Sequence, residues 1–150
     1  MSKPRKPSGR GKVVRVRRAG PAHAVVSVRA ARKKDEAYRY RREPCAECPW
    51  RKDAPVGAFP AEAFRISADT AYDQSDRAFS CHMSGAEKAA TCAGFLLRGA
   101  THNLGIRMRY AFGDIEPGSV TSDVPLYRSY REMAEANGVD PDDPKLARCR

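Results

Sequence analysis

The chain has 150 residues, of which 41% are hydrophobic, and a formal net charge of +10. This length allows one domain plus a tail, and so modest a core often needs a metal or a disulfide to stabilise it. No run of about 18 apolar residues occurs and no apolar segment follows the basic N-terminus, which excludes a transmembrane helix and a secretory signal. We therefore expect a cytoplasmic protein without a membrane partner, whose cysteines bind metal rather than form disulfides.

The positive charge is concentrated at the start of the chain. Residues 1–42 carry 15 Lys and Arg against two acidic residues, a net charge of +13, whereas residues 43–150 carry 13 against 16, a net charge of −3. A basic arm beside a mildly acidic domain favours contact with nucleic acid or another polyanion. A solubilising, disordered tail is the alternative, because charge alone carries no specificity.

The first predicted elements lie in this basic arm. Residues 1–12 contain Pro, Gly, Ser and basic residues with nothing to bury, which indicates disorder. Valines then alternate with arginines or serine on either side of a Gly-Pro turn, which is typical of a β-hairpin at 13–29 with a valine face and an arginine face. Two strands alone are marginally stable, so a loose arm is the alternative. Tyr38 and Tyr40 follow in a further basic stretch, where they are candidates to stack on bases.

Three helices are predicted in the rest of the chain. The first begins with Pro60 at its first position and carries apolar residues at helical spacing up to Tyr72. The second begins at Thr91, a plausible N-cap, and continues to Ala111 with a break near 99–103. The third is capped by Ser122 or Asp123, opens at Pro125 and ends at 137–138.

Together these elements predict a small α+β domain, with a mostly α domain as the alternative. The expected organisation is a partly disordered basic arm at 1–42, a metal-binding domain at 43–138 and a loose tail at 139–150. Cys149 lies in this tail and is expected to be a spare, exposed thiol.

The chemistry of the domain is expected to centre on Cys45, Cys48, Cys81 and Cys92. Two residues between Cys45 and Cys48 let both sulfurs turn toward one ion while backbone N–H groups point at the sulfurs. Thiolates are soft ligands, so zinc and an iron–sulfur cluster are the candidate cofactors, with zinc slightly favoured by its frequency in structural four-thiolate sites. The alternative for Cys81 and Cys92 is that they are ordinary buried small residues.

Neighbouring residues strengthen this prediction. Pro49 directly follows a ligand, as in bacterial ferredoxin sequences, and the charge of Arg51 can offset the negative charge of the thiolates. His82 follows Cys81, and adjacent residues rarely ligate one ion, so we expect His82 to hydrogen-bond near the ligands or to replace one of them.

At CAECPWR, FSCHMSG and TCAGFLLRGATHNLGIR the sequence resembles a family of small bacterial and phage proteins known mainly as a domain of unknown function. The resemblance covers about residues 43–110. It implies that the four cysteines are the family's cysteines and that Pro49, Trp50, Arg51, His82 and Gly94 are their companions in a shared metal-centred fold. It implies no activity.

The four cysteines and the basic arm leave three candidate functions. The first is a zinc-stabilised binding module whose arm contacts nucleic acid through charge, without a recognised base-reading motif. The second is a redox or sensor protein that uses an iron–sulfur cluster, or a reversible Cys45–Cys48 dithiol, although a thioredoxin-like context is missing. The third is a zinc hydrolase or deaminase, but His82 lacks the glutamate two residues on that the deaminase signature requires, so a binding role is favoured over an enzymatic one.

Ten basic residues of the arm are predicted to neutralise phosphates: Arg15, Arg17, Arg18, Arg29, Arg32, Lys33, Lys34, Arg39, Arg41 and Arg42.

Overall fold

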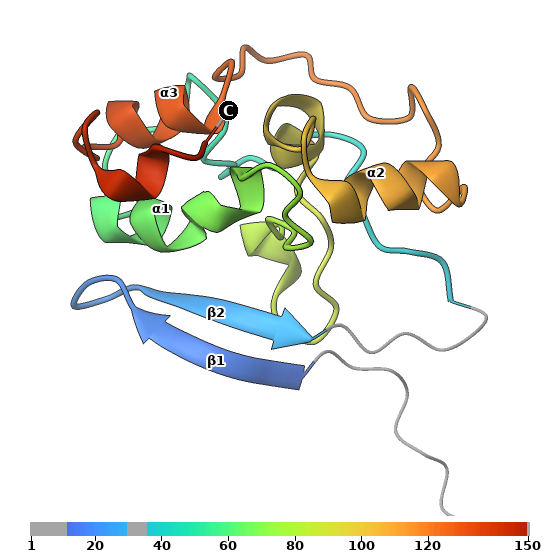
Figure 1. Cartoon of the computed structure of the whole chain (residues 1–150), viewed down its shortest axis with the longest axis horizontal. Coiled ribbons are helices and arrows are strands. Elements are labelled where there is room, and N and C mark those ends of the chain that lie inside the picture. Colours follow the sequence, from blue (N-terminus) through green and yellow to red (C-terminus); the bar gives the residue numbers. More distant parts are fainter. Residues whose placement is uncertain (1–11, 30–35, 150) are drawn as a thin grey trace, which may run out of the picture.

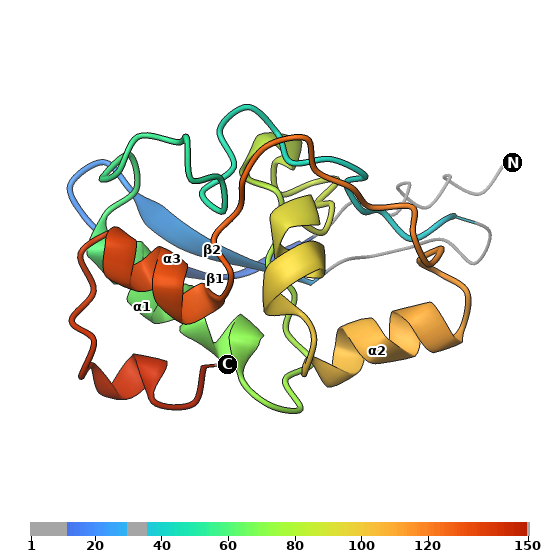
Figure 2. The ribbon, with the colours of Figure 1, turned by 90° about the horizontal axis from the view of Figure 1, so that it is seen from above.

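The protein is a mixed α+β domain, as the sequence predicts. The computed structural model describes residues 12–29 and 36–149, so the predictions made for 1–11 and for Arg32, Lys33 and Lys34 lie outside these residues. Lys12, the last residue of the segment predicted to be disordered, is the first residue of a strand. A two-stranded sheet lies along one side of the helices, and α2 projects at the far end from α1 and α3 (Figures 1 and 2). The regular elements are β1 Lys12–Arg18, β2 Ala24–Arg29, α1 Ala61–Ser67, α2 Leu104–Ala111 and α3 Tyr130–Ala136.

Shorter helical turns complete the described part of the chain. They comprise 3₁₀ turns at Ala68–Ala71, His82–Ser84 and Pro144–Leu146 and a π-helical turn at Phe95–Gly99. Within 12–29 and 36–149, every helix is too short or too polar to span a bilayer.

The predicted N-terminal hairpin is confirmed. Strands β1 and β2 are antiparallel, and a bulge between Val13 and Arg15 adds one residue to β1. Because residues directly opposite each other share a face, the pair Val16–Val26 marks a valine face and the pair Arg15–Ser27 an arginine face.

Both faces of β2 border the rest of the domain, since Val26 and Val28 line a cavity with Phe59 and Phe64, and Val25 and Ser27 line a groove beside residues 76–80. Val16 is 59% exposed and Val26 is 44% exposed, whereas Arg17, Val25 and Ser27 on the other face are partly buried. Strand β2 packs against α1. Arg15 and Arg17 of the arginine face line this groove between the hairpin and the rest of the domain.

The first two predicted helices form with shifted starts. Pro60 is the N-cap of α1 rather than its first helical residue, and a 3₁₀ turn prolongs this helix to Ala71. The second prediction corresponds to the π-helical turn and α2, with the expected break between them. Thr91 does not cap the first part, since its hydroxyl contacts the Tyr38 hydroxyl at 2.5 Å. Asn103 caps α2 by accepting a hydrogen bond from the Ile106 amide at 2.9 Å.

The predicted start of the third helix is wrong. Helix α3 begins at Tyr130, and the Ser129 side chain caps it by accepting a hydrogen bond from the Glu132 amide at 3.1 Å. Residues 125–127 are instead extended and pair with 50–52, through hydrogen bonds from Lys52 N to Pro125 O and from Tyr127 N to Trp50 O. This pairing satisfies backbone groups that a helix from Pro125 would leave unpaired at the centre of the fold.

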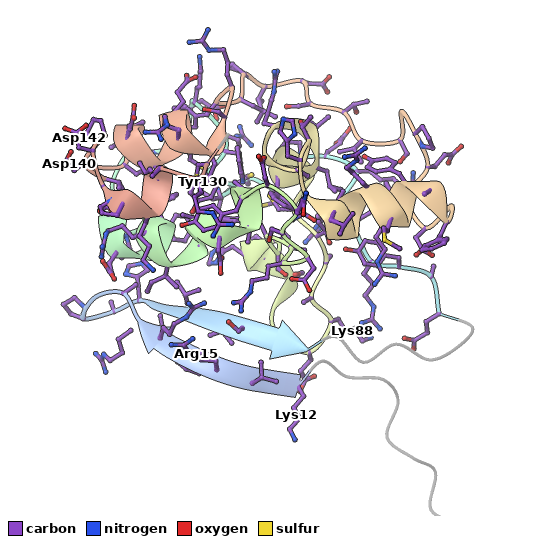
Figure 3. The ribbon with its side chains drawn as sticks, in the orientation of Figure 1. Lys12, Arg15, Lys88, Tyr130, Asp140 and Asp142 are labelled. Atoms are coloured by element: carbon purple, nitrogen blue, oxygen red, sulfur yellow. The ribbon has the colours of Figure 1, made fainter. Side chains whose placement is uncertain are left out.

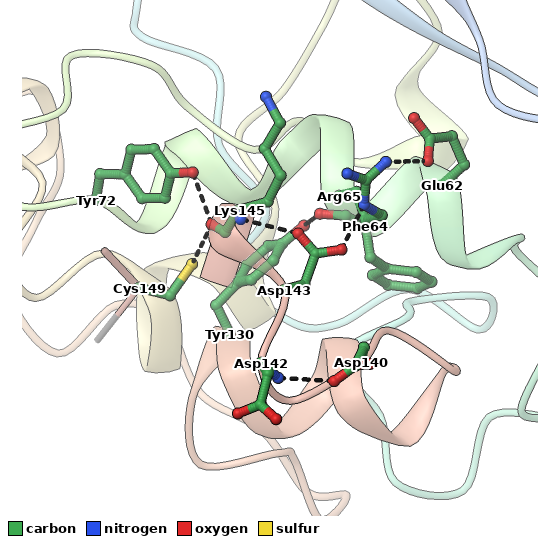
Figure 4. A network of polar contacts seen from close by, with 10 residues as sticks. All are labelled: Glu62, Phe64, Arg65, Tyr72, Tyr130, Asp140, Asp142, Asp143, Lys145 and Cys149. Carbon is green, nitrogen blue, oxygen red and sulfur yellow. Dashed lines mark hydrogen bonds and ion pairs between the residues drawn. The ribbon is translucent and has the colours of Figure 1, made fainter. Parts of the chain in front are cut away.

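The C-terminal segment is packed rather than loose. Leu146 is fully buried, and Cys149 is only 9% exposed, so the expectation of an exposed thiol is wrong. Figure 4 shows the polar contacts of this segment with Arg65 of α1 and with Tyr72, beside the bond from Tyr130 of α3 to Phe64 O. The Tyr72 hydroxyl donates to Lys145 O at 2.6 Å, and the Arg65 guanidinium binds the Asp143 carboxylate at 2.6 Å. Burial raises the pKa of Cys149 to about 11, which keeps this thiol protonated at neutral pH.

Replacing Leu146 should therefore destabilise the domain. We expect Leu146→Ala to lower the free energy of unfolding by about 2–5 kcal/mol, the usual cost of emptying a buried leucine site, as measured by urea denaturation. Lys145→Ala is the matched control, because Lys145 is exposed and its neighbours bind its backbone. Equal stability of the two variants would contradict the packed position of this segment.

Candidate metal centre

A tight turn presents the first two cysteines. The Cys48 amide donates to Cys45 O at 3.1 Å, and the Arg51 amide donates to Cys48 O at 3.1 Å. These two successive turns bring Cys45 and Cys48 to the same side of the loop. The Glu47 amide hydrogen-bonds the Cys45 sulfur, and the Trp50 amide hydrogen-bonds the Cys48 sulfur. This is the pattern of amides on sulfurs that the C-x2-C spacing predicts.

Strand-like pairing brings the other two cysteines together. The Cys81 amide donates to Ala90 O at 2.6 Å, and the Cys92 amide donates to Phe79 O at 2.9 Å. Residues 79–81 and 90–92 therefore run side by side, and the ten residues between the cysteines form a loop closed at its base. The Ser84 hydroxyl tightens this loop by binding Cys81 O at 2.7 Å.

The four predicted ligands meet as two pairs. The sulfurs of Cys48 and Cys92 are 3.7 Å apart, and Cys81 is near enough to Cys45 to help raise the pKa of that thiol. All four are free thiols, with Cys48, Cys81 and Cys92 buried and Cys45 partly exposed. Among the described residues, no group of three or more His, Cys, Asp or Glu side chains is placed so that it could hold a metal ion. The four sulfurs lie near one another, and binding of one metal ion by all four would require them to move closer together.

The electrostatics of the site favour a thiolate at its centre. The hydrogen bond with Cys92 lowers the pKa of Cys48 to about 7, and the Trp50 and Gly94 amides and the charge of Arg51 act in the same direction against burial. The same hydrogen bond and burial raise the pKa of Cys92 well above its usual value. Burial, with the charges of Cys81 and Cys48, raises the pKa of Cys45 to about 11. The pKa values of Cys45, Cys48 and Cys92 therefore depend on the neighbouring thiols, as expected for closely placed sulfurs.

The residues next to Cys45 and Cys48 have distinct roles. Arg51 binds the Asp53 carboxylate through two hydrogen bonds at 2.7 and 2.8 Å and also donates to Cys45 O at 3.4 Å. Its positive charge is therefore held close to the sulfurs. Pro49 is partly buried and lines a cavity of about 320 Å³ that also reaches Cys81.

His82 lies at the exposed rim of the site. Its Nε2 lies 3.1 Å from the Glu47 carboxylate, and its ring packs edge-on against Phe59 with centroids 5.1 Å apart. Glu47 lies between the first two cysteines and His82 follows the third, so this contact joins the two ligand loops on their outer side. The structure places His82 beside the ligand loops, with a carboxylate rather than a sulfur as its hydrogen-bond partner.

Trp50 connects the site to the hydrophobic core. It is fully buried, and its ring contacts those of Phe79, Phe95 and Tyr130, with centroids 5.7 to 6.4 Å apart. The π-helical turn lies against its other side, where a Cβ on Gly94 or Gly99 would come within 2.5 Å of the ring or its Cβ. Hydrogen bonds between residues five apart widen the turn and bring residues with this spacing onto one face. The backbone of Gly94 and that of Gly99 therefore both contact the indole.

The segment 38–42 is docked on the domain. The Thr91 amide donates to Arg39 O at 3.0 Å, and the Arg41 amide donates to Thr91 O at 2.9 Å. The rings of Tyr38 and Tyr40 stack on each other, with their hydroxyls bound to Thr91 and Ser119.

Arginines cover these two tyrosines. The Arg109 guanidinium lies 4.5 Å from the Tyr38 ring centre and that of Arg42 lies 5.2 Å from the Tyr40 ring centre. The tyrosines therefore support arginines rather than offering free faces for bases.

Residues 40–150 match the model of the family of unknown function DUF6283. The chain belongs to this family. No curated protein and no solved structure matches the chain. The match begins in the docked segment and includes the packed C-terminal residues, so it is wider than the stretch of about 43–110 that carries the resemblance. The hairpin lies outside it.

Two substitutions test the contact between the π-helical turn and Trp50. Gly94→Ala and Gly99→Ala each place a methyl group inside the contact distance of the indole, and we expect each to lower the free energy of unfolding by about 1–3 kcal/mol, the range for overpacking. Gly20→Ala is the control, because its added Cβ would lie 3.6 Å from Pro60. Urea denaturation followed by circular dichroism measures the three variants, and an unchanged Gly99→Ala protein would contradict this packing.

Proposed function

We propose that this protein binds one zinc ion through the thiolates of Cys45, Cys48, Cys81 and Cys92. The observation that carries the proposal is the 3.7 Å distance between the Cys48 and Cys92 sulfurs. Four sulfurs at about 2.3 Å from a tetrahedral zinc ion lie about 3.8 Å from one another. The first sulfur pair therefore already has the spacing of one edge of such a site.

The donor set and its surroundings also support zinc. Backbone amides bind the sulfurs of Cys45, Cys48 and Cys92, and such bonds stabilise the negative charge of thiolate ligands. Four thiolates fill the coordination of a structural zinc ion, so the ion would stabilise the fold and leave no open position for substrate. An iron–sulfur cluster uses the same ligand type and is the alternative that metal analysis must separate.

We further propose that the hairpin and the segment 36–42 bring this domain to nucleic acid or another polyanion. Arg15, Arg17 and Arg18 lie on β1, and Arg39, Arg41 and Arg42 lie on the docked segment. Figure 3 shows Lys12 and Arg15 on the hairpin, well away from Asp140 and Asp142 in the C-terminal segment. The arginines of the hairpin and of this segment would attract phosphates.

The zinc proposal is tested by metal content. Protein purified without oxygen should be colourless and contain one zinc per chain, without iron or sulfide. Replacing any of the four ligands by serine should remove most of the zinc and lower the melting temperature by several degrees, because metal binding and folding are coupled. Cys149→Ser is the matched control, since this buried thiol lies with Ala68 and Lys145, and it should keep its zinc. A brown protein with iron and sulfide would favour the cluster, and ligand variants that keep both zinc and stability would refute the site.

The polyanion proposal is tested by salt. Affinity for a labelled oligonucleotide, measured by fluorescence anisotropy, should fall about 100-fold between 50 and 200 mM salt if about five phosphates are contacted. The reason is that each contact releases counterions from the phosphate backbone. Affinity that does not change with salt, or no binding at 50 mM, would refute an electrostatic contact.

A further inference from the structure

A groove of about 1,170 Å³ lies between the hairpin and α2. Arg15, Arg17 and residues 25–28 of the hairpin form one wall, residues 76–80 lie along its floor, and α2 with residues 37–39 forms the other wall. Its volume slightly exceeds the 300–1,000 Å³ typical of pockets for drug-sized ligands. It therefore has room for a short stretch of extended polymer and not for a folded domain.

The groove is strongly basic. The lining carboxylates are those of Asp69 and Asp76, and five arginines come from both walls and the floor: Arg15, Arg17, Arg39, Arg77 and Arg109. Arg39 also pairs with Glu36 at 3.3 Å and Arg109 with Asp114 at 3.0 Å, so part of this positive charge is offset within the protein. Arg77 is 58% exposed although it lies 3.3 Å from Asp69, so its guanidinium still reaches the open space. The charge of the lining thus favours an anionic occupant with repeated negative groups.

The groove also offers flat and apolar surfaces. Phe112, at the C-terminal end of α2, is 72% exposed, and Val14 and Met108 on opposite walls are 52% and 44% exposed. Arg109 lies 4.5 Å over the ring of Tyr38 and presents a planar cation to the groove. Guanidinium planes and aromatic rings are the surfaces on which nucleic-acid bases stack.

Phosphates and exposed base faces occur together in a single-stranded nucleic acid. A duplex presents its phosphates but keeps its bases paired and stacked, so it cannot use Phe112. An acidic peptide supplies charge without flat rings. The combination of five arginines with an exposed phenylalanine therefore discriminates among polyanions.

We propose that this groove binds a few nucleotides of single-stranded nucleic acid, with phosphates on the arginines of both walls and a base on Phe112. The proposal rests on the proposed polyanion contact. It adds where the polyanion binds, that a single-stranded nucleic acid is preferred to a duplex, and that Phe112 is the stacking residue. DNA and RNA share this chemistry, and the experiment separates them.

The test uses the full-length protein with fluorescein-labelled ten-nucleotide oligothymidylate, oligouridylate and a ten-base-pair duplex, by anisotropy at 50 mM salt. We expect either single strand to bind at least about tenfold more tightly than the duplex, and the tighter of the two identifies the preferred sugar. Phe112→Ala should weaken single-strand binding about 5- to 150-fold, the range for losing one stacked base, and leave duplex binding unchanged. Val56→Ala is the matched control, because Val56 is 65% exposed and lies outside the groove lining.

Arginine variants test the walls. Arg15→Ala combined with Arg17→Ala should reduce the slope of log affinity against log salt by about 1.4, because each lost phosphate contact on a single strand removes about 0.7. Arg128→Ala removes an 84% exposed arginine outside the groove lining and should leave the slope unchanged. Thermal melting of each variant confirms that the fold is kept.

The outcomes separate the two proposals. Duplex binding as tight as single-strand binding, or an unaffected Phe112→Ala protein, would overturn the groove and leave the general polyanion contact standing. Displacement of the oligonucleotide by an equal charge of polyglutamate would also overturn it, because an acidic peptide would then suffice. No binding of any oligonucleotide would refute the groove and the contact with nucleic acid together.

Discussion

The burial of Trp50 is the constraint on which the rest of the structure depends. Its indole fills the space between α3 and the π-helical turn, and only glycine fits where the turn meets the ring. Cys48 precedes the tryptophan by two residues and Cys92 precedes Gly94 by two residues. Packing of this one ring therefore sets the distance between two sulfurs that lie 44 residues apart in the chain. The hydrophobic core and the candidate metal centre therefore depend on the same packing contacts.

The sequence predicted the parts of the fold that depend on local patterns. The alternating valines specified the hairpin, and the C-x2-C spacing specified a turn with amides on its sulfurs. The pairing of 79–81 with 90–92 was not predictable, because it depends on contacts across a loop of ten residues and on the docked segment beside it. A local signal for α3 was present in Ser129 and Glu132, three residues apart as in a capping box, but Pro125 offered a competing start.

Burial was the hardest property to read from the sequence. The C-terminal segment contains acidic residues and prolines, which are typical of loose tails, yet Leu146 and Cys149 complete the core against α1. The two tyrosines of the basic arm were plausible stacking residues, but their hydroxyls bind the domain and arginines cover their rings. The exposed aromatic ring at the basic groove is Phe112, at the C-terminal end of α2. Its position opposite the hairpin could not be predicted from local sequence patterns, because the two elements are far apart in the chain.

Trp50 also gives the protein an intrinsic fluorescent probe. The chain contains one tryptophan, and that side chain is fully buried. Fluorescence excited near 295 nm thus reports on a single apolar environment two residues from a candidate ligand. An electron-rich sulfur or a coloured cofactor nearby would quench this emission, whereas a colourless closed-shell ion would preserve it. The state of the sulfurs can thus be followed in the unmodified protein, without any label.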